Sequence, residues 1–278
     1  MVDVMAVLEP SKLPDDAARI QDAINRVENL PMEYSRKHNT LLRGAVLLKK
    51  GEYRVTGSLD INQSGVVLRG EGSKPDGTVI KSIKAVHGSL INITGHMVST
   101  EGPQSLEIKG DNIVVERPGS QQWVSEIRMG SNPPEHDPYT SYEWDATLFT
   151  FRFERTIVEI DHNSDTITVD IPMIMSFGPK YGPGRIYPFV HKYNTISDVG
   201  IENLRLIGNM DLHHPKTQQQ TVPAINIDNT IHDWVSDVVA ETFAGGIQAS
   251  RWSRFITIQN CEVRGLNGFV LQGQMGLR

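Results

Sequence analysis

The chain has 278 residues, of which 38% are hydrophobic and 22% charged, a balance typical of globular proteins and unlike that of disordered chains or membrane spans. A mild net charge of -6, without a basic run, argues against nucleic acid as a partner. The single cysteine, Cys261, excludes an internal disulfide and a cysteine-based zinc site.

The segment PDDAARIQDAINRVENL, residues 14–30, predicts one amphipathic helix. Asp15 and Asp16 lie near its start, where carboxylates interact favourably with the helix dipole. Its apolar residues recur at helical spacing: Ala18, Ile20, Ile24, Val27 and Leu30. The residues before it show no basic segment followed by a long apolar one, so no secretory signal is visible.

Downstream of the helix, short β-favouring runs alternate with Gly, Asn or Ser. Examples are GAVLLKKGEYRVTG, SLDINQSGVVLRGEG, GTVIKSIK, SLINITG and SLEIKGDNIVV. Strands this short at this rhythm are typical of a solenoid, a sandwich or a barrel.

An internal repeat in the last third of the chain favours the solenoid. The segments IENLRL (201–206), VSDVVA (235–240) and IQNCEV (258–263) share the pattern apolar, polar, Asn or Asp, apolar, any, apolar. The last two lie 23 residues apart, a period typical of a β-solenoid turn. The repeat predicts that Asn203, Asp237 and Asn260 are corner residues and that Cys261 fills a core position.

A second series, Ile225, Ile247 and Val270, has the same period and predicts a further stacked strand in each repeat. Residues 118–147 interrupt the rhythm and predict a large surface loop. After it, TIVEIDHNSDTITVDIP predicts a hairpin that turns at residues 162–165. SFGPKYGPGRIYPFVHKYN then predicts a loop that returns the chain to the repeats.

The helix PDDAARIQDAI, followed by GAVLLKKGEYRVTGSLDI and GVVLRGEG, resembles the start of the pectate-lyase-like, right-handed parallel β-helix superfamily. The later repeats resemble coils of the same superfamily. The resemblance implies an all-β parallel β-helix with an N-terminal capping helix and an inserted hairpin and long loop. We therefore expect a single domain over 1–278, with a cap at about 1–40, an insertion at about 118–190 and coils over 193–278.

The superfamily contains lyases, glycosidases and tailspikes, so the fold leaves the activity open. The resemblance implies a polysaccharide or oligosaccharide partner and a secreted or periplasmic location. The polygalacturonase and pectate lyase motifs do not carry over, because Gly95-His96 is followed by Met97 and no Arg-x-Pro-x-x-Arg occurs. Ile160-Asp161-His162 resembles a pectate lyase motif, but it lies in the predicted hairpin turn.

Polar residues on neighbouring repeats supply a candidate catalytic set. Cleavage of an acidic polysaccharide by β-elimination needs a base and a cation that stabilises the enolate, whereas hydrolysis needs two carboxylates. The spacing places Asp228 beside Arg251 and His232 beside Arg254 on successive coils. The alternative interpretation is that these residues form ordinary surface ion pairs at polar corners.

Other residues are candidates for binding. Asp211, His213 and His214 precede a polar loop, which is either a ligand site or a solvated loop. Trp123, Tyr142 and Trp144 lie in the long loop, where they either stack on sugar rings or cover an apolar surface. No spaced set of oxygen ligands identifies a metal or another cofactor, and Ca²⁺ is left open.

The final segment, GFVLQGQMGLR, ends on a predicted strand with no capping element. We therefore expect either a fragment of a longer protein or self-association through an uncovered end. The sequence predicts a polysaccharide lyase or glycosidase. The alternative is a non-catalytic β-helix that binds glycans or has a structural role, as tailspikes and adhesins do.

Overall fold

The computed structural model describes residues 2–36, 38–84, 88–98, 110–127, 144–148, 150–188, 192–209, 223–249, 253–265 and 270–271. The chain is mostly β-structure and divides into two compact units. Unit 1 contains residues 1–98 and 192–278, and unit 2 contains residues 99–191. The second unit starts at Ser99, about twenty residues before the insertion expected at about 118–190.

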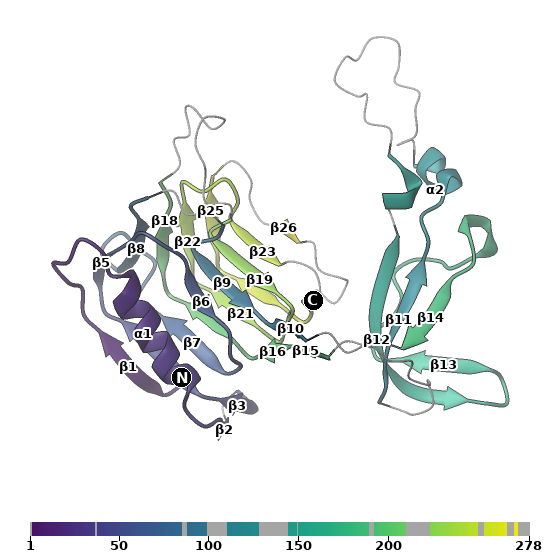
Figure 1. Cartoon of the computed structure of the whole chain (residues 1–278), viewed down its shortest axis with the longest axis horizontal. Helices are drawn as coiled ribbons and strands as arrows, with labels where there is room; N and C mark the ends of the chain where they lie inside the picture. Colours follow the sequence, from purple (N-terminus) through teal and green to yellow (C-terminus); the bar gives the residue numbers. More distant parts are fainter. Residues whose placement is uncertain are drawn as a thin grey trace, which may run out of the picture. The chain divides into compact units, whose positions relative to one another are not determined.

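Unit 1 is built from three parallel sheets (Figure 1). Sheet 1 contains β1 (Val4–Leu8), β4 (Gly44–Leu48), β7 (Val66–Arg69), β17 (Gly200–Glu202), β21 (Trp234–Ser236) and β24 (Thr257–Gln259). Sheet 2 contains β5 (Gly51–Val55), β8 (Thr78–Ser82), β18 (Arg205–Ile207), β22 (Val239–Glu241) and β25 (Glu262–Arg264). Sheet 3 contains β6 (Leu59–Ile61), β9 (Ile91–Thr94), β19 (Ile225–Asp228), β23 (Ile247–Ala249) and β26 (Val270–Leu271).

From β4 onward, the chain gives one strand to each sheet in rotation. We call each set of three strands a rung: β4, β5 and β6 form rung 1, and β24, β25 and β26 form rung 5. Rungs 2 and 3 are separated in sequence by unit 2, yet their strands pair directly, since Ile201 aligns with Leu68. Apolar side chains from all three sheets form one buried core.

The register confirms the first predicted repeat. Ile201 aligns with Val235, which aligns with Ile258 in sheet 1. In sheet 2, Leu206 aligns with Ala240, which aligns with Val263, as the repeat predicts. In the second series, Ile225 aligns with Ile247 as predicted, but Val270 aligns with Gln248. The last strand of sheet 3 is therefore shifted by one residue relative to the predicted series.

The predicted corner residues bend the chain between sheets 1 and 2. Asn203, Asp237 and Asn260 have φ of 55°, 56° and 52°, a left-handed conformation that Asn and Asp tolerate better than most residues. The backbone N–H of Asn203 donates to Ser236 O at 3.1 Å, and that of Asp237 donates to Gln259 O at 3.1 Å. The corner therefore joins successive rungs through the backbone. Cys261 is partly buried against the core, as its place in the repeat predicts.

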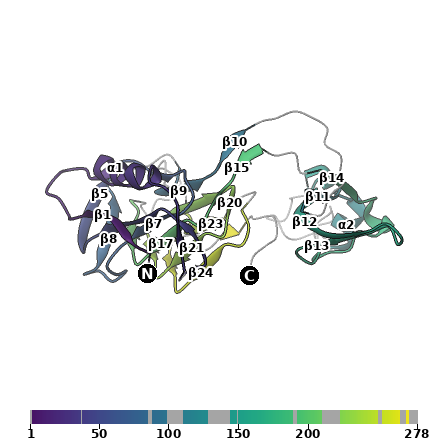
Figure 2. The same ribbon diagram turned by 90° about the horizontal axis from the view of Figure 1, so that it is seen from below.

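The predicted helix is α1 (Ala17–Glu28), which lies alongside β1 at the N-terminal end of unit 1 (Figure 2). Its buried residues, Ile20, Ala23, Ile24 and Val27, belong to the core of the sheets. Asp15 Oδ1 accepts a hydrogen bond from Ala17 N at 2.9 Å, consistent with the predicted role of a carboxylate at the helix start. Residues 33–35 (β2) and 40–42 (β3) form a short antiparallel pair after the helix.

Unit 2 contains a four-stranded antiparallel sheet in the order β13, β12, β11, β14. These strands are β11 (Asn112–Arg117), β12 (Phe151–Asp161), β13 (Thr166–Val169) and β14 (Arg185–Pro188). The predicted hairpin is confirmed, because β12 and β13 pair around residues 162–165. Two expectations are wrong: the NIVV strand belongs to this sheet and not to the repeats, and the predicted return loop contains β14.

The described part of the predicted loop 118–147 contains a short helix, α2 (Gln121–Glu126). The 3-10 helix η1 (Ala146–Leu148) begins where this loop ends. A second 3-10 helix, η2 (Pro179–Tyr181), follows β13. Two strands of unit 1, β10 (His96–Val98) and β15 (Lys192–Asn194), pair antiparallel where the chain leaves and re-enters the rungs. The inserted residues are thus bracketed by a two-stranded ribbon that pairs Val98 with Lys192.

Candidate functional site

The sequence-predicted residues His232 and Arg254 lie on neighbouring rungs. After β19, the chain passes through the short strand β20 (Thr230–Ile231) to β21. Ile231 forms a parallel bridge with Arg254, and the backbone N–H of His232 donates to Arg254 O at 3.1 Å. We call residues 195–199, 228–233 and 253–256 the His232 corner. Residues 195–199 lead from β15 to β17, residues 228–233 lead from β19 to β21, and residues 253–256 precede β24, so all three segments enter sheet 1 at the same place on successive rungs.

The backbone of this corner repeats from rung to rung. Asp198, His232 and Phe255 have φ of 59°, 62° and 57°. The His232 side chain is exposed, and its ring lies 5.1 Å from the ring of Phe255, between centroids, with a tilt of 40°. Left-handed backbone is costly for a residue such as Phe, so three repetitions indicate that the stacked rungs impose this turn. The imidazole is therefore presented outward on a firmly held backbone.

Asp228 ends β19 and is half-buried. It aligns with Thr94 of rung 2, and its carbonyl accepts a hydrogen bond from Gly95 N at 3.1 Å. On the other side, the pairing of Ile227 with Ala249 leads into residues 250–252. Arg251, the predicted neighbour of Asp228, lies outside the described residues, so this predicted pair stays a prediction.

Buried polar side chains underlie the same corner, and sequence reasoning did not select them. Asn229 is 4% exposed, Thr230 0%, Asp233 1% and Ser253 3%. Burial raises the pKa of Asp233 to about 8, so this carboxyl is mostly protonated at neutral pH. Alignment of the repeats would have identified Asp233, because Asp233 aligns with Val199 and Ile256, which are both buried apolar residues.

A row of polar side chains crosses the outer face of sheet 3. Asp60, Asn92, Asn226 and Gln248 align on four successive rungs, and all four are half-buried. Asn92 Nδ2 donates to Asp60 Oδ1 at 2.8 Å. We call these four residues the amide row. Neighbouring strands lie about 4.8 Å apart, so the amide row presents one hydrogen-bonding group per rung at that spacing.

The predicted aromatic residues of unit 2 are partly engaged in packing. Trp123, in α2, lies edge-on to Phe151 with ring centroids 5.0 Å apart, and the guanidinium of Arg117 lies 5.4 Å from its ring. Trp144 is half-buried, with its ring 6.4 Å from that of Trp123. These contacts support the alternative in which Trp123 covers an apolar surface.

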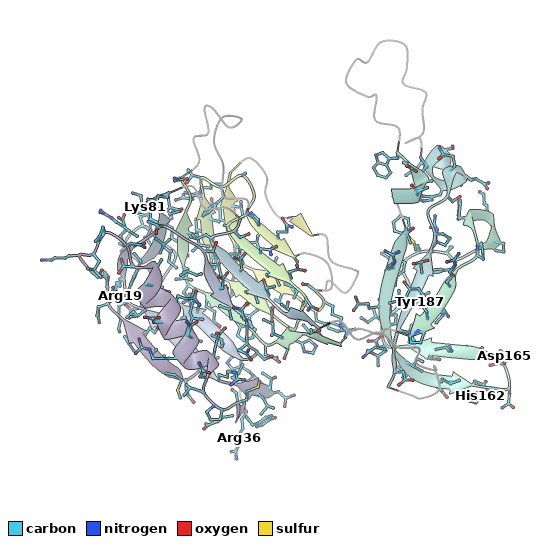
Figure 3. All side chains as sticks on the ribbon, viewed as in Figure 1. Arg19, Arg36, Lys81, His162, Asp165 and Tyr187 are labelled. Atoms are coloured by element: carbon cyan, nitrogen blue, oxygen red, sulfur yellow. The ribbon has the colours of Figure 1, made fainter. Side chains whose placement is uncertain are left out.

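Several predicted binding residues, Tyr142, Asp211, His213 and His214, lie outside the described residues. His162 is exposed in the turn between β12 and β13, near Asp165 (Figure 3), where the sequence placed it. Within the described ranges, no group of three or more His, Cys, Asp or Glu residues could hold a metal ion. None of the described helices is long and apolar enough to span a membrane.

No family model matches the chain, and no curated protein matches it. Solved structures from bacteriophages match the chain at low sequence identity and with TM-scores below 0.5. The ORF18 protein of Geobacillus virus E2 is 12% identical with a TM-score of 0.42, the match covering 98% of this chain and 39% of that one. The gp61 tailspike of Pseudomonas phage phi297 is 12% identical with a TM-score of 0.40, covering 82% and 39%.

A third similar structure is the Gp54 tailspike of Acinetobacter baumannii bacteriophage AP22, solved with a capsular saccharide. It is 11% identical with a TM-score of 0.33, and the match covers 91% of this chain and 44% of that one. The chain therefore spans less than half the length of each of these three proteins.

Proposed function

We propose that unit 1 is a right-handed parallel β-helix and that it binds a polysaccharide along the amide row and the adjoining His232 corner. The rotation of strands through three parallel sheets around one shared core supports the β-helix. The observation that carries the binding proposal is the amide row, which continues in register across four rungs.

The chemistry of the amide row suits a glycan. Asn and Gln side chains both donate and accept hydrogen bonds, as sugar hydroxyls do, and Asp60 adds a strong acceptor. A polysaccharide is itself a chain of repeated polar units, so successive rungs can contact successive sugars. At one end of rung 3, Asp228 extends the polar face from Asn226 towards the His232 corner.

Cleavage of the bound glycan is a second candidate function, supported by the proximity of His232 and Arg254. Arg254 is only partly buried on this corner, and a guanidinium is the group best suited to pair with a substrate carboxylate. The exposed imidazole of His232, on the same corner, has the chemistry of a base. Asp228 and Arg251 complete the proposed set, while Trp123, Tyr142, Trp144, Asp211, His213 and His214 stay proposed binding residues.

The binding test compares the full chain with variants on two faces, using polygalacturonate, alginate, hyaluronate and uncharged dextran as probes. Replacing both amides (Asn226→Ala with Gln248→Ala) should weaken binding about tenfold or more, because each lost hydrogen bond is worth about 1 kcal/mol. Gln259→Ala is the matched control, since this exposed amide lies on sheet 1. Equal binding by the double variant and the control would contradict a site on the amide row.

Two further arms separate the alternatives. A variant in which Asn-Gly replaces residues 99–191 keeps the pairing of Val98 with Lys192 and removes the aromatic residues of unit 2. Loss of binding in this variant would move the site to unit 2. Incubation with the same polymers, followed by ultraviolet absorbance of unsaturated products and by reducing ends, distinguishes a lyase from a hydrolase. His232→Ala should abolish any activity found.

A further inference from the structure

Asp233 occupies a core position of the stacked rungs. The residue just before sheet 1 is Val199 at the start of rung 3, Asp233 at rung 4 and Ile256 at rung 5. All three are buried, with exposures of 0%, 1% and 3%. Burying a carboxyl group at such a position costs folding free energy, because the group loses the water that solvates it. Its presence between two aliphatic residues calls for a reason specific to this rung.

Asp233 connects three rungs at this corner. Its Oδ1 accepts a hydrogen bond from Val199 N at 2.9 Å, and its backbone carbonyl accepts one from Thr257 N at 2.9 Å. The preceding residue, His232, bonds to Arg254 through its backbone, and Arg254 N in turn donates to Thr230 O at 3.0 Å. The side chain of Asp233 thus adds a buried side-chain hydrogen bond to the backbone hydrogen bonds that join the turn carrying His232 to the rung before it.

The second oxygen, Asp233 Oδ2, is buried beside Thr230. Thr230 Oγ1 is close enough to lower the pKa of Asp233. However, neither Thr230 Oγ1 nor Asp233 Oδ2 makes a hydrogen bond of normal geometry with a described residue. A carboxylate can only accept a hydrogen bond, whereas a protonated carboxyl can also donate one. The Thr230 hydroxyl can donate to the carboxylate or accept from the protonated acid. The neutral form is favoured by burial, and in that form Asp233 can donate to Thr230 while it accepts from Val199.

Among the described residues, the groups that shift the pKa of Asp233 are Thr230, Val199 and Asp198, and none of them carries a positive charge. Asp198, on the preceding rung, raises the pKa of Asp233 by repulsion, and burial raises it more strongly. Asp228 lies at the start of the same turn. The two groups that can carry positive charge, His232 and Arg254, lie on the outer side of the corner and are more exposed than Asp233.

We propose that Asp233 is a positioning residue, which as a neutral acid holds the His232 corner in place and which releases the corner when it ionises. His232 and Arg254 are then presented together only in the protonated state of Asp233. The consequence for ligand binding rests on the proposed function, whereas the consequence for the corner itself does not.

The expected pH dependence follows from the direction of the pKa shift. The unfolded carboxyl titrates near 3.8 and the folded one near 8, so the folded state holds a proton that the unfolded state has lost. The stabilisation is complete below about pH 4 and is lost as pH rises through about 8. The corner should therefore loosen at alkaline pH.

Asp233→Asn tests the proposal, because an amide can accept from Val199 N and donate to Thr230 as the neutral acid does. The unfolding midpoint of the full chain should fall more steeply between pH 4 and 8 than that of the variant. Asp237→Asn, at a half-buried aspartate in the left-handed corner between sheets 1 and 2, should keep the wild-type slope. Identical slopes for Asp233→Asn and the wild type would overturn the proposal.

Two measurements on the wild type keep the test independent of how well the variant folds. Carboxyl-carbon NMR of aspartate-labelled protein should show one group that titrates near pH 8, and all aspartates titrating below about pH 5 would refute the buried neutral acid. Amide hydrogen exchange at Val199 and His232, corrected for intrinsic rates, should accelerate above pH 8 relative to Ile201. Uniform acceleration would remove the positioning role.

Binding to the four polymers then links the residue to the proposed site. Wild-type binding should fall at least severalfold above pH 8, whereas Asp233→Asn should retain it. If none of the polymers binds at any pH, the proposed function fails while the titration and exchange results still decide the role of Asp233. Parallel pH profiles of binding in the two proteins would refute the link.

Discussion

Arg117 in unit 2 shows how a single buried charge can be accommodated by aromatic rings. Arg117 is 3% exposed. Its guanidinium lies 5.4 Å from the ring centroid of Trp123, 5.3 Å from that of Phe151 and 4.7 Å from that of Tyr181. Its Nη1 also donates to Met175 Sδ at 3.4 Å. Nε and Nη2 have no hydrogen-bond partner among the described residues, so the ring faces provide the main compensation for lost water.

We expect Arg117→Lys to destabilise unit 2 more than Arg117→Met. Lysine keeps the buried charge but loses the planar stacking on the rings, which should cost about 2 kcal/mol. Methionine loses the same stacking but removes the charge, and replacing a buried charge by an apolar residue of similar volume is often nearly neutral. Urea unfolding followed by tryptophan fluorescence measures both. A methionine variant less stable than the lysine variant would show that the charge has a partner that stabilises it.

At the residue scale, sequence reasoning found the parts of the site that obey the repeat. His232 and Arg254 were selected because they lie about one repeat apart, and the backbone does bring them together. Asp233 was overlooked as one more polar residue in a polar turn. Its importance comes from its position in the core row, which appears only when it is aligned with Val199 and Ile256.

In unit 1, strand β22 is linked to the neighbouring strands β18 and β25 by ion pairs as well as by backbone hydrogen bonds. Glu241 on β22 pairs with Arg205 on β18 and with Arg264 on β25, the latter at 2.7 Å. Burial tends to raise the pKa of Glu241, but the hydrogen bonds and charges of Arg205 and Arg264 outweigh it and lower the pKa. One carboxylate thus links three successive rungs on the outer face of sheet 2.

Glu241→Gln should therefore destabilise the protein by about 1–2 kcal/mol at neutral pH, because Arg205 would lose its charged partner. Since the folded pKa of Glu241 is lowered, its contribution is present above the ordinary value of 4.5 and is lost as pH falls below it. Denaturation at pH 7 and pH 3 checks both parts. Glu262→Gln is the matched control: its side chain is 54% exposed and, among the described residues, pairs with Arg264 alone, so its loss should destabilise the protein much less than the loss of Glu241.

Element type could be predicted from the sequence more reliably than element partners. The NIVV strand was identified, but a strand that pairs antiparallel in unit 2 has the same alternation as a strand in the rungs. The Val270 shift has a similar cause, because neighbouring apolar residues, Val270 and Leu271, fit either register. Both errors concern which segments meet in space, and a local pattern does not specify that.

At the scale of the whole molecule, the rungs form a one-dimensional stack in which each rung contacts mainly the rungs before and after it. Unit 2 is inserted between rungs 2 and 3 without breaking this stack, because β7 still pairs with β17. The N-terminal helix and the repeat could be predicted because both depend on local periodicity. Of the sheet in unit 2, the hairpin of β12 and β13 could be predicted, but the pairing of β11 with β12 and β14 could not, because these strands lie far apart in the sequence.

A stack of this kind should tolerate removal of one complete rung. Deleting residues 234–256 joins Asp233 directly to Thr257, so β24 takes the place of β21 against β17 and Ile258 takes the place of Val235 over Ile201. We expect a folded, cooperative protein with similar β-structure by circular dichroism. Its unfolding free energy should be lower, since two interfaces between rungs are replaced by one.

The control deletion removes only residues 234–244, which is about half a rung. It brings strands of different sheets into the same row and misaligns the buried residues, so this variant should be unfolded or aggregated. The comparison separates a stack of equivalent rungs from a globular core that happens to contain three parallel sheets. In a globular core the larger deletion would remove more buried apolar surface and do more damage, whereas in a solenoid the larger deletion is the milder one.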